Sequence, residues 1–146
     1  MELPRPLRAA IDAELAGVPA ASLRAASDTL TGRYRAEVRD GRLHLSSEMF
    51  AKAYIAARMP ATFAALMATM SALAEAMPDF APKSLLDIGA GPGTSLWAAT
   101  ETFTGLEAAT LLEASTSIRQ VGERLANSVF SFRPDWRSGT IAEQGG

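Results

Sequence analysis

The sequence predicts an α/β protein, in which an N-terminal helical region at 1–78 precedes a βαβ unit at 83–146. In the first region, apolar residues recur at the spacing of amphipathic helices. In the second, two short apolar runs at 84–87 and 109–113 each end in an acid, as buried parallel strands do at a sheet edge. A glycine-rich turn and a helix-compatible segment separate these runs, which is the order of elements in a βαβ unit.

The first helix is expected to begin at the prolines of the N-terminus and to end at Gly17. Leu7, Ile11 and Leu15 recur at four-residue spacing in this stretch, so they form one apolar face. A second helix is predicted at 22–37, a turn at 40–41, and a third helix from a cap at Ser46 or Ser47. Their inward side chains are expected to be Leu23, Leu30 and Tyr34 in the second helix and Phe50 and Tyr54 in the third.

A fourth helix is predicted to start at Pro60 and to carry the most regular apolar stripe of the chain. Methionines within this stripe are also typical of adaptable partner surfaces, but the spacing favours a packed core. Two prolines at 78–82 prevent the helix from continuing and form a linker to the βαβ unit. The stripe consists of Phe63, Leu66, Met67, Met70, Leu73 and Met77.

The most informative segment for function is SLLDIGAGPGT at 84–94. Its glycines let the backbone turn tightly after the strand and approach a ligand, and the following helix starts with free N–H groups beside it. The third glycine comes one residue too early for the dinucleotide fingerprint, and no lysine follows Lys83 to complete a P-loop. An acid two residues before G-x-G-x-G resembles the first motif of class I S-adenosylmethionine-dependent methyltransferases.

The charges of S-adenosylmethionine suit this segment. The ligand has no pyrophosphate and carries an ammonium and a sulfonium, so an acid at the strand end fits it better than a basic cradle. Glu113, twenty residues after the last glycine, is expected to accept hydrogen bonds from the ribose hydroxyls. An ordinary strand–helix turn, with the first acid as a helix cap, is the alternative. The expected cofactor-binding residues are Asp87, Gly89, Ala90, Gly91, Gly93 and Glu113.

Composition excludes several other classes of function. The chain contains no cysteine and a single histidine, His44, so we expect neither a disulfide nor a metal site. The net charge of −2 gives no general attraction to DNA or to anionic membranes, and the uncharged stretch at 59–74 is short for a membrane span. Nothing resembles a secretory signal, so a cytoplasmic location is expected. A group of arginines is either solvated or contacts RNA phosphates: Arg33, Arg35, Arg39 and Arg42.

Several short segments are similar to the ribosomal small-subunit methyltransferase-like family of bacteria and mitochondria. They are LPRPL at 3–7, ARMPAT at 57–62, DFAP at 79–82 and LEAS at 112–115, and the resemblance covers about residues 3–126. It implies a Rossmann-like methyltransferase fold that is bound to the small ribosomal subunit and assists its assembly or translation. In this family pattern the glycines line the cofactor, Asp87 faces its amino-acid end and Glu113 takes the ribose.

The resemblance also shows which parts of the family pattern this sequence lacks. Family members continue with further strands, a motif that contacts the methyl acceptor, and cysteines that bind an iron–sulfur cluster. We therefore expect a truncated fold in which a third strand starts near 136–141. The chain alone is expected to be incomplete as an enzyme, and we assign no catalytic residue. A non-catalytic factor that binds ribosomal RNA is the alternative function, and a truncated product that cannot fold alone is the third reading.

Overall fold

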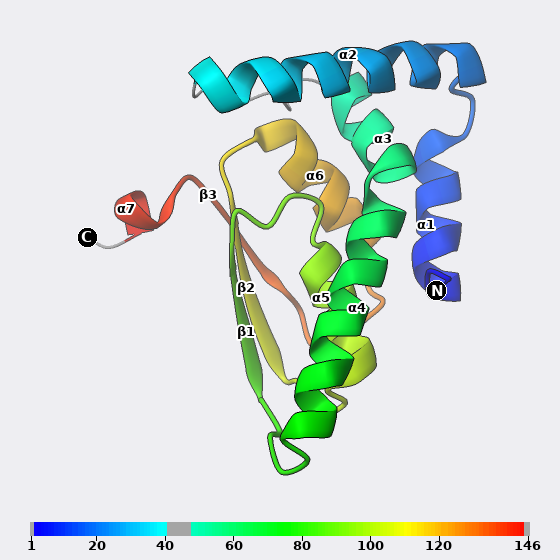
Figure 1. The fold of residues 1–146 in the computed structure, drawn as a ribbon. Helices are drawn as coiled ribbons and strands as arrows, with labels where there is room; N and C mark the ends of the chain where they lie inside the picture. The colour runs from blue at the N-terminus through cyan, green and yellow to red at the C-terminus, as the bar shows by residue number, and fades with distance from the viewer. Residues whose placement is uncertain (1, 41–47, 145–146) are drawn as a thin grey trace.

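The computed structural model describes residues 2–40 and 48–144, and it confirms the predicted α/β class: helices come first and a parallel sheet alternating with helices follows (Figure 1). The turn at Gly41 and the residues Arg42, His44, Ser46 and Ser47 lie outside the described residues. The elements in chain order are α1 (Arg5–Leu15), α2 (Ala20–Asp40), α3 (Glu48–Ala57), α4 (Met59–Ala76), β1 (Ser84–Ile88), α5 (Thr94–Thr102), β2 (Ala108–Glu113), α6 (Thr116–Leu125), β3 (Asp135–Ser138) and α7 (Ile141–Gln144).

The three strands are parallel and lie in the order β1-β2-β3, with Asp87 opposite Leu111 and Glu113 opposite Ser138. The predicted third strand is therefore present, beginning at Asp135. Both connections move along the sheet in the same direction, so crossovers of one hand place α5 and α6 on the same face. Figure 1 shows α4, α5 and α6 together on that side of the sheet. On the other face, the side chains of Leu86 and Ile88 are 61% and 51% exposed.

The main hydrophobic core joins the N-terminal helices to the βαβ unit. Phe63 of α4 and Leu7 of α1 are buried against α5 and α6, so the two regions share one apolar interior. A second cluster lies between the sheet and its helices, with Trp136 packed at its side. The main core consists of Leu7, Ile11, Ala51, Ile55, Met59, Phe63, Trp97, Ala98, Ile118, Val121 and Leu125.

One arginine reinforces this junction from the surface. Arg124 of α6 donates from Nε to Oε1 of Glu14 in α1 at 2.6 Å, and from Nη2 to Oε1 of Glu48 in α3 at 2.6 Å. The hydrogen bond to Glu14 is the largest cause that raises the pKa of Arg124, desolvation opposes it, and the charges of both acids add to it. These ion pairs therefore link α1, α3 and α6 at the surface, outside the core.

The apolar face predicted for the first helix is confirmed, and that of the third is confirmed in part, at Tyr54. Leu7 and Ile11 are buried, but α3 buries Ala51, Ala53 and Ile55, and leaves Phe50 and Tyr54 half-buried. Tyr54 packs against the main core from its half-buried position, and the small alanine side chains let α3 lie close to α2 and α6. In α2, Leu23 is half-buried, while the side chains of Leu30 and Tyr34 and those of Arg33, Arg35 and Arg39 are outside the described part.

The stripe of α4 contacts the core along most of its length: Phe63 is buried, and Leu66, Met67 and Met70 are half-buried and pack against the core. Phe63 is 2% exposed, but Leu73 and Met77 are 38% and 52% exposed, so the prediction of a buried stripe was wrong at this end. The 18 residues of α4 span roughly 27 Å and the 9 residues of α5, its main neighbour, roughly 14 Å, because an α-helix rises about 1.5 Å per residue. The C-terminal end of α4 therefore extends past the helix that covers it.

No described helix has both the length and the apolarity that crossing a membrane requires. The described residues also contain no group of three or more acidic or histidine side chains that could hold a metal ion.

Candidate functional site

The glycine loop between β1 and α5 is anchored to the end of the neighbouring strand. The backbone N–H groups of Gly89 and Ala90 both donate to the carbonyl oxygen of Leu112 at 2.9 Å. The N–H group of Gly93 donates back to the carbonyl oxygen of Ala90 at 3.0 Å, which closes the turn. The loop residues predicted from the sequence therefore lie at the carboxyl edge of the sheet, where β1 and β2 both end.

The three glycines of the loop serve two different purposes. All have positive φ angles, +77° at Gly89, +57° at Gly91 and +85° at Gly93, which side chains rarely adopt. A Cβ placed on either of the first two would meet no atom within 4 Å, so the backbone there borders open space that a ligand could use. A Cβ on Gly93 would instead lie 2.9 Å from Cη2 of Trp136, so the third glycine is also needed for packing.

Trp136 of β3 forms the base of the loop, and the sequence alone did not identify this role. Its ring edge lies against Gly93 and against Gly122 of α6, where an added Cβ would be 2.6 Å from Cη2 of Trp136. The same Cβ would lie 2.9 Å from the carbonyl oxygen of Pro92, inside the loop itself. A glycine within the strongly amphipathic helix α6 was the only sequence signal of this close approach.

Glu113 connects the loop to the next helix. Its Oε1 accepts a hydrogen bond from the N–H group of Gly91 at 2.7 Å, and its Oε2 accepts one from the N–H group of Ser115 at 2.8 Å. Both bonds are charge-assisted and engage one lone pair of each oxygen, so each oxygen keeps acceptor capacity. The half-buried carboxylate thus lies beside the open space at Gly91, where the predicted bond to a ribose would have to form.

Asp87 lies on the helix side of β1, and its Oδ2 accepts a hydrogen bond from the hydroxyl of Ser95 in α5. The N-cap of α5 is Gly93 in a left-handed conformation, and no side chain caps that end. The alternative in which Asp87 caps the helix backbone is therefore not what the structure shows. Ser95 is a further site residue that the sequence did not single out.

These contacts bring all six predicted residues together at one edge of the sheet. The site combines two carboxylates with a backbone turn that has open space above it, and it lies beside the amino end of α5. The segment 84–94 contains no lysine or arginine. This arrangement suits a ligand that carries cationic groups and hydroxyls rather than several phosphates.

Comparison with known proteins gives one family. The model of the family described as mitochondrial small ribosomal subunit Rsm22 matches residues 48–144, more than half of the chain. The match runs from the start of α3 to the end of α7 and includes the glycine loop, Glu113 and Trp136. None of the curated proteins matches the chain.

Proposed function

The chain belongs to the mitochondrial small ribosomal subunit Rsm22 family, and from this premise we propose that it works with the small ribosomal subunit as an S-adenosylmethionine-binding, methyltransferase-like protein. The family match supports the association with the small subunit. The glycine loop and the two carboxylates support the choice of ligand. The same proposal includes contact with ribosomal RNA, which such a protein would either methylate or bind while the subunit assembles.

The residues at the loop fit this cofactor on two counts. Backbone at Gly89 and Gly91 borders open space, so a ligand can lie directly on the main chain without displacing a side chain. The chemistry of the site is acidic and not basic, as an ammonium and a sulfonium require. In the proposal Glu113 binds the ribose hydroxyls with the free lone pairs of its carboxylate, and Asp87 attracts the cationic amino-acid end.

The bound cofactor would supply a methyl group activated by its attachment to a sulfonium. The protein's contribution at this edge is to hold and orient that donor, which is the main requirement for a transfer governed by alignment. Glu113 is the observation that carries the proposal. Because it already binds Gly91 and Ser115 through backbone N–H groups, its carboxylate is oriented before any ligand arrives, which lowers the cost of binding.

The first test is a calorimetric titration of the 146-residue chain with S-adenosylmethionine and S-adenosylhomocysteine. Gly91→Ala would place a methyl group in the ligand space, and Gly17→Ala is its matched control, because both glycines have positive φ and open surroundings. Both variants should lose about 1 kcal/mol of stability or slightly more, but only Gly91→Ala should abolish binding. Glu113→Gln should weaken affinity by about tenfold or more, and Glu107→Gln, an exposed acid elsewhere, should not.

Two results would contradict the site assignment. The first is a cooperatively folded chain that binds neither compound. The second is an affinity that neither Gly91→Ala nor Glu113→Gln changes.

A non-catalytic assembly factor is the second candidate, and one observation favours it. Both carboxylates of the site already hold structural hydrogen bonds, Asp87 with Ser95 and Glu113 with Gly91 and Ser115. A protein that keeps the fold only as a scaffold would need these bonds without a cofactor. Sedimentation with purified small subunits at several salt concentrations separates the candidates. Association that persists after Glu113→Gln, and is lost only when the arginines at 33–42 are neutralised, would favour the scaffold.

A further inference from the structure

The free edge of β1 is the less protected of the two edges of the sheet. β1 and β3 are the outer strands, and no further strand of the described residues pairs with either. β3 is short and carries two exposed charged residues, Asp135 and Arg137. β1 pairs with β2 without a bulge from Ser84 to Ile88 and contains neither proline nor lysine. Charges, prolines and bulges are what normally keeps an edge strand from pairing with another chain, so β1 is open to such pairing.

The side chains of β1 on the open face of the sheet are largely apolar. Successive strand residues point to opposite faces, and the burial of β1 alternates in the same way. Leu85 and Asp87 are half-buried on the side of the helices, whereas Ser84, Leu86 and Ile88 are exposed on the other face. The edge therefore combines a free strand with two large apolar side chains in contact with water.

The backbone groups of these three exposed residues point away from β2. The carbonyl oxygen of Lys83 accepts a hydrogen bond from β2 at 3.2 Å, and the N–H group of Gly89 donates one to β2 at 2.9 Å. Backbone groups alternate in direction along a strand, so the odd-numbered residues turn theirs towards β2. Ser84, Leu86 and Ile88 consequently turn their N–H and carbonyl groups to the free edge.

We propose that β1 pairs with β1 of a second copy of this chain, in antiparallel orientation about a twofold axis at Leu86. Leu86 would then lie opposite Leu86 of the second copy, and Ser84 opposite Ile88. Because all of these residues turn their backbone groups to the edge, each opposed pair would exchange two N–H···O=C bonds, as hydrogen-bonded pairs of an antiparallel ladder do. A twofold contact uses the same surface on both copies, so the assembly closes as a dimer that leaves only the charged β3 edges outside.

The charges beside the edge fit a second copy. Asp87 would have Leu85 of the second copy directly opposite it, so no two acids face each other. Lys83 of the second copy would lie diagonally from Asp87, and its long side chain, which is 66% exposed, can reach across such a distance. The symmetry forms this pair of opposite charges twice. The strand thus complements itself in backbone bonds, apolar contacts and charge.

The dimer is compatible with the candidate cofactor site but does not depend on it. Antiparallel pairing sends the carboxyl ends of the two β1 strands in opposite directions. The two glycine loops would therefore lie at opposite ends of the joined sheet, and both would stay open. This inference goes beyond the proposed function, and the absence of cofactor binding would leave it unchanged.

The first test is sedimentation of the 146-residue chain from about 1 µM to about 1 mM. Pairing through one short strand makes a small interface, so we expect a dissociation constant of roughly 10–100 µM. Leu86→Lys and Leu86→Glu would each place like charges opposite each other and should weaken the dimer about tenfold or more. An equal mixture of these two variants should associate again. Ile141→Lys is the matched control, because Ile141 is 57% exposed but lies in α7, and it should have no effect.

The second test is cysteine cross-linking, which reports the register because the chain contains no cysteine of its own. Leu86→Cys should give a disulfide-linked dimer, since the Cα atoms of a hydrogen-bonded pair are about 5.5 Å apart, within the range of disulfides. Ser84→Cys and Ile88→Cys should not cross-link alone, because the two equivalent residues would be about 13 Å apart along the strands. A mixture of these last two variants should cross-link.

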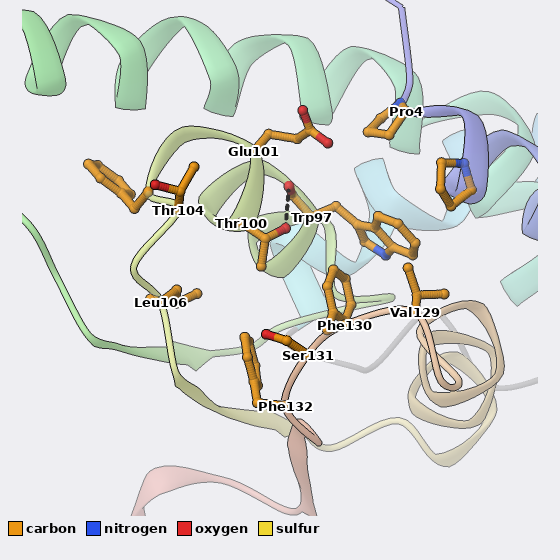
Figure 2. Close-up of a pocket in the computed structure, with 12 residues that line it drawn as sticks. Pro4, Trp97, Thr100, Glu101, Thr104, Leu106, Val129, Phe130, Ser131 and Phe132 are labelled. Carbon is orange, nitrogen blue, oxygen red and sulfur yellow. Dashed lines mark hydrogen bonds between the residues drawn. The ribbon is translucent and has the colours of Figure 1, made fainter.

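The fold of each variant is checked at Trp97, which lies away from the edge. Its indole lines a cavity of about 280 Å³ to which β1 contributes no residue, and Figure 2 shows it beside Phe130, with ring centroids 4.8 Å apart. The indole NMR signal should be the same in all variants. If Leu86→Lys changes it, the cysteine variants decide alone.

Three results would overturn the proposal. The first is a chain that stays monomeric at about 1 mM. The second is a dimer that a correctly folded Leu86→Lys variant does not weaken. The third is cross-linking of Ile88→Cys alone that is as efficient as that of Leu86→Cys, which would indicate that the open faces of two sheets pack on each other instead.

Discussion

Replacing Gly122 by alanine tests how the glycine loop is supported. Gly122 is buried in α6, and the new methyl group would lie 2.6 Å from Cη2 of Trp136 and 2.9 Å from the carbonyl oxygen of Pro92. Both separations are shorter than real Cβ contacts, so the tryptophan, the loop or the helix must move. The carbonyl of Pro92 belongs to the backbone and cannot rotate away as a side chain could.

The size of the effect follows from two opposing contributions. Overpacking of this kind costs about 1–3 kcal/mol, while replacing glycine by alanine inside a helix gains about 1 kcal/mol. Because one of the two contacts is with backbone, we expect the cost to lie in the upper part of its range. The net loss should then be about 1–2 kcal/mol of unfolding free energy.

Urea unfolding measures this loss, and Gly32→Ala provides the matched control. Gly32 also lies in a helix, but a Cβ there would meet no atom within 4 Å, so its substitution should stabilise the chain by up to about 1 kcal/mol. In a Trp136→Phe background, the shorter ring should remove part of the cost of Gly122→Ala, which a double-mutant cycle detects. If Gly122→Ala stabilised the chain as much as Gly32→Ala, the tight packing at the loop would be disproved.

Two further predictions concern the sheet and the helix junction. Leu111→Ala, in the covered face of the sheet, should lower the unfolding free energy by about 2–5 kcal/mol. Leu86→Ala, in the other face, should change it by less than about 0.5 kcal/mol, because Leu86 is 61% exposed. Similar losses for the two variants in urea unfolding would show that the second face is covered. Arg124→Met should cost roughly 1 kcal/mol, because the arginine side chain is 45% exposed. The pKa of Arg124 is raised, so its contribution is complete below the ordinary pKa of a free arginine and is lost only as the pH rises through the raised pKa. The stability lost in Arg124→Met should therefore not depend on pH around neutrality through this group. The loss should become smaller with added salt, and a loss that salt leaves unchanged would contradict a screened surface interaction.

The sequence predicted the parts of the fold that depend on local pattern. The order of strand, acid, glycines and helix at 84–94 placed Asp87 at the end of β1, and the spacing to Glu113 placed both acids at the same edge. Its pattern also identified the buried face of α1 at Leu7 and Ile11. These results follow because backbone conformation and strand ends are set by neighbouring residues.

The sequence could not predict features that depend on which elements meet. Met77 belongs to a regular stripe, yet it is exposed because its neighbour α5 is too short to cover it. The three glycines look alike in the sequence, but only Gly93 packs against Trp136, which lies more than forty residues later. The short helix Ile141–Gln144 had no signal in the sequence pattern, and in it Oε2 of Glu143 accepts a hydrogen bond from the N–H group of Thr140.

The shared core has a consequence for how the protein folds during its synthesis. Arg124 and its partner Glu14 are 110 residues apart, and Leu7 and Ile11 are buried by the same α6 that carries Arg124. At translation rates of about 5–20 residues per second, α1 must wait roughly 5–20 seconds before its partner helix has been made. Helix α3 is made earlier and can cover part of the apolar face of α1, but the part that α6 covers stays open during this interval, in which chaperones that bind nascent chains can recognise it.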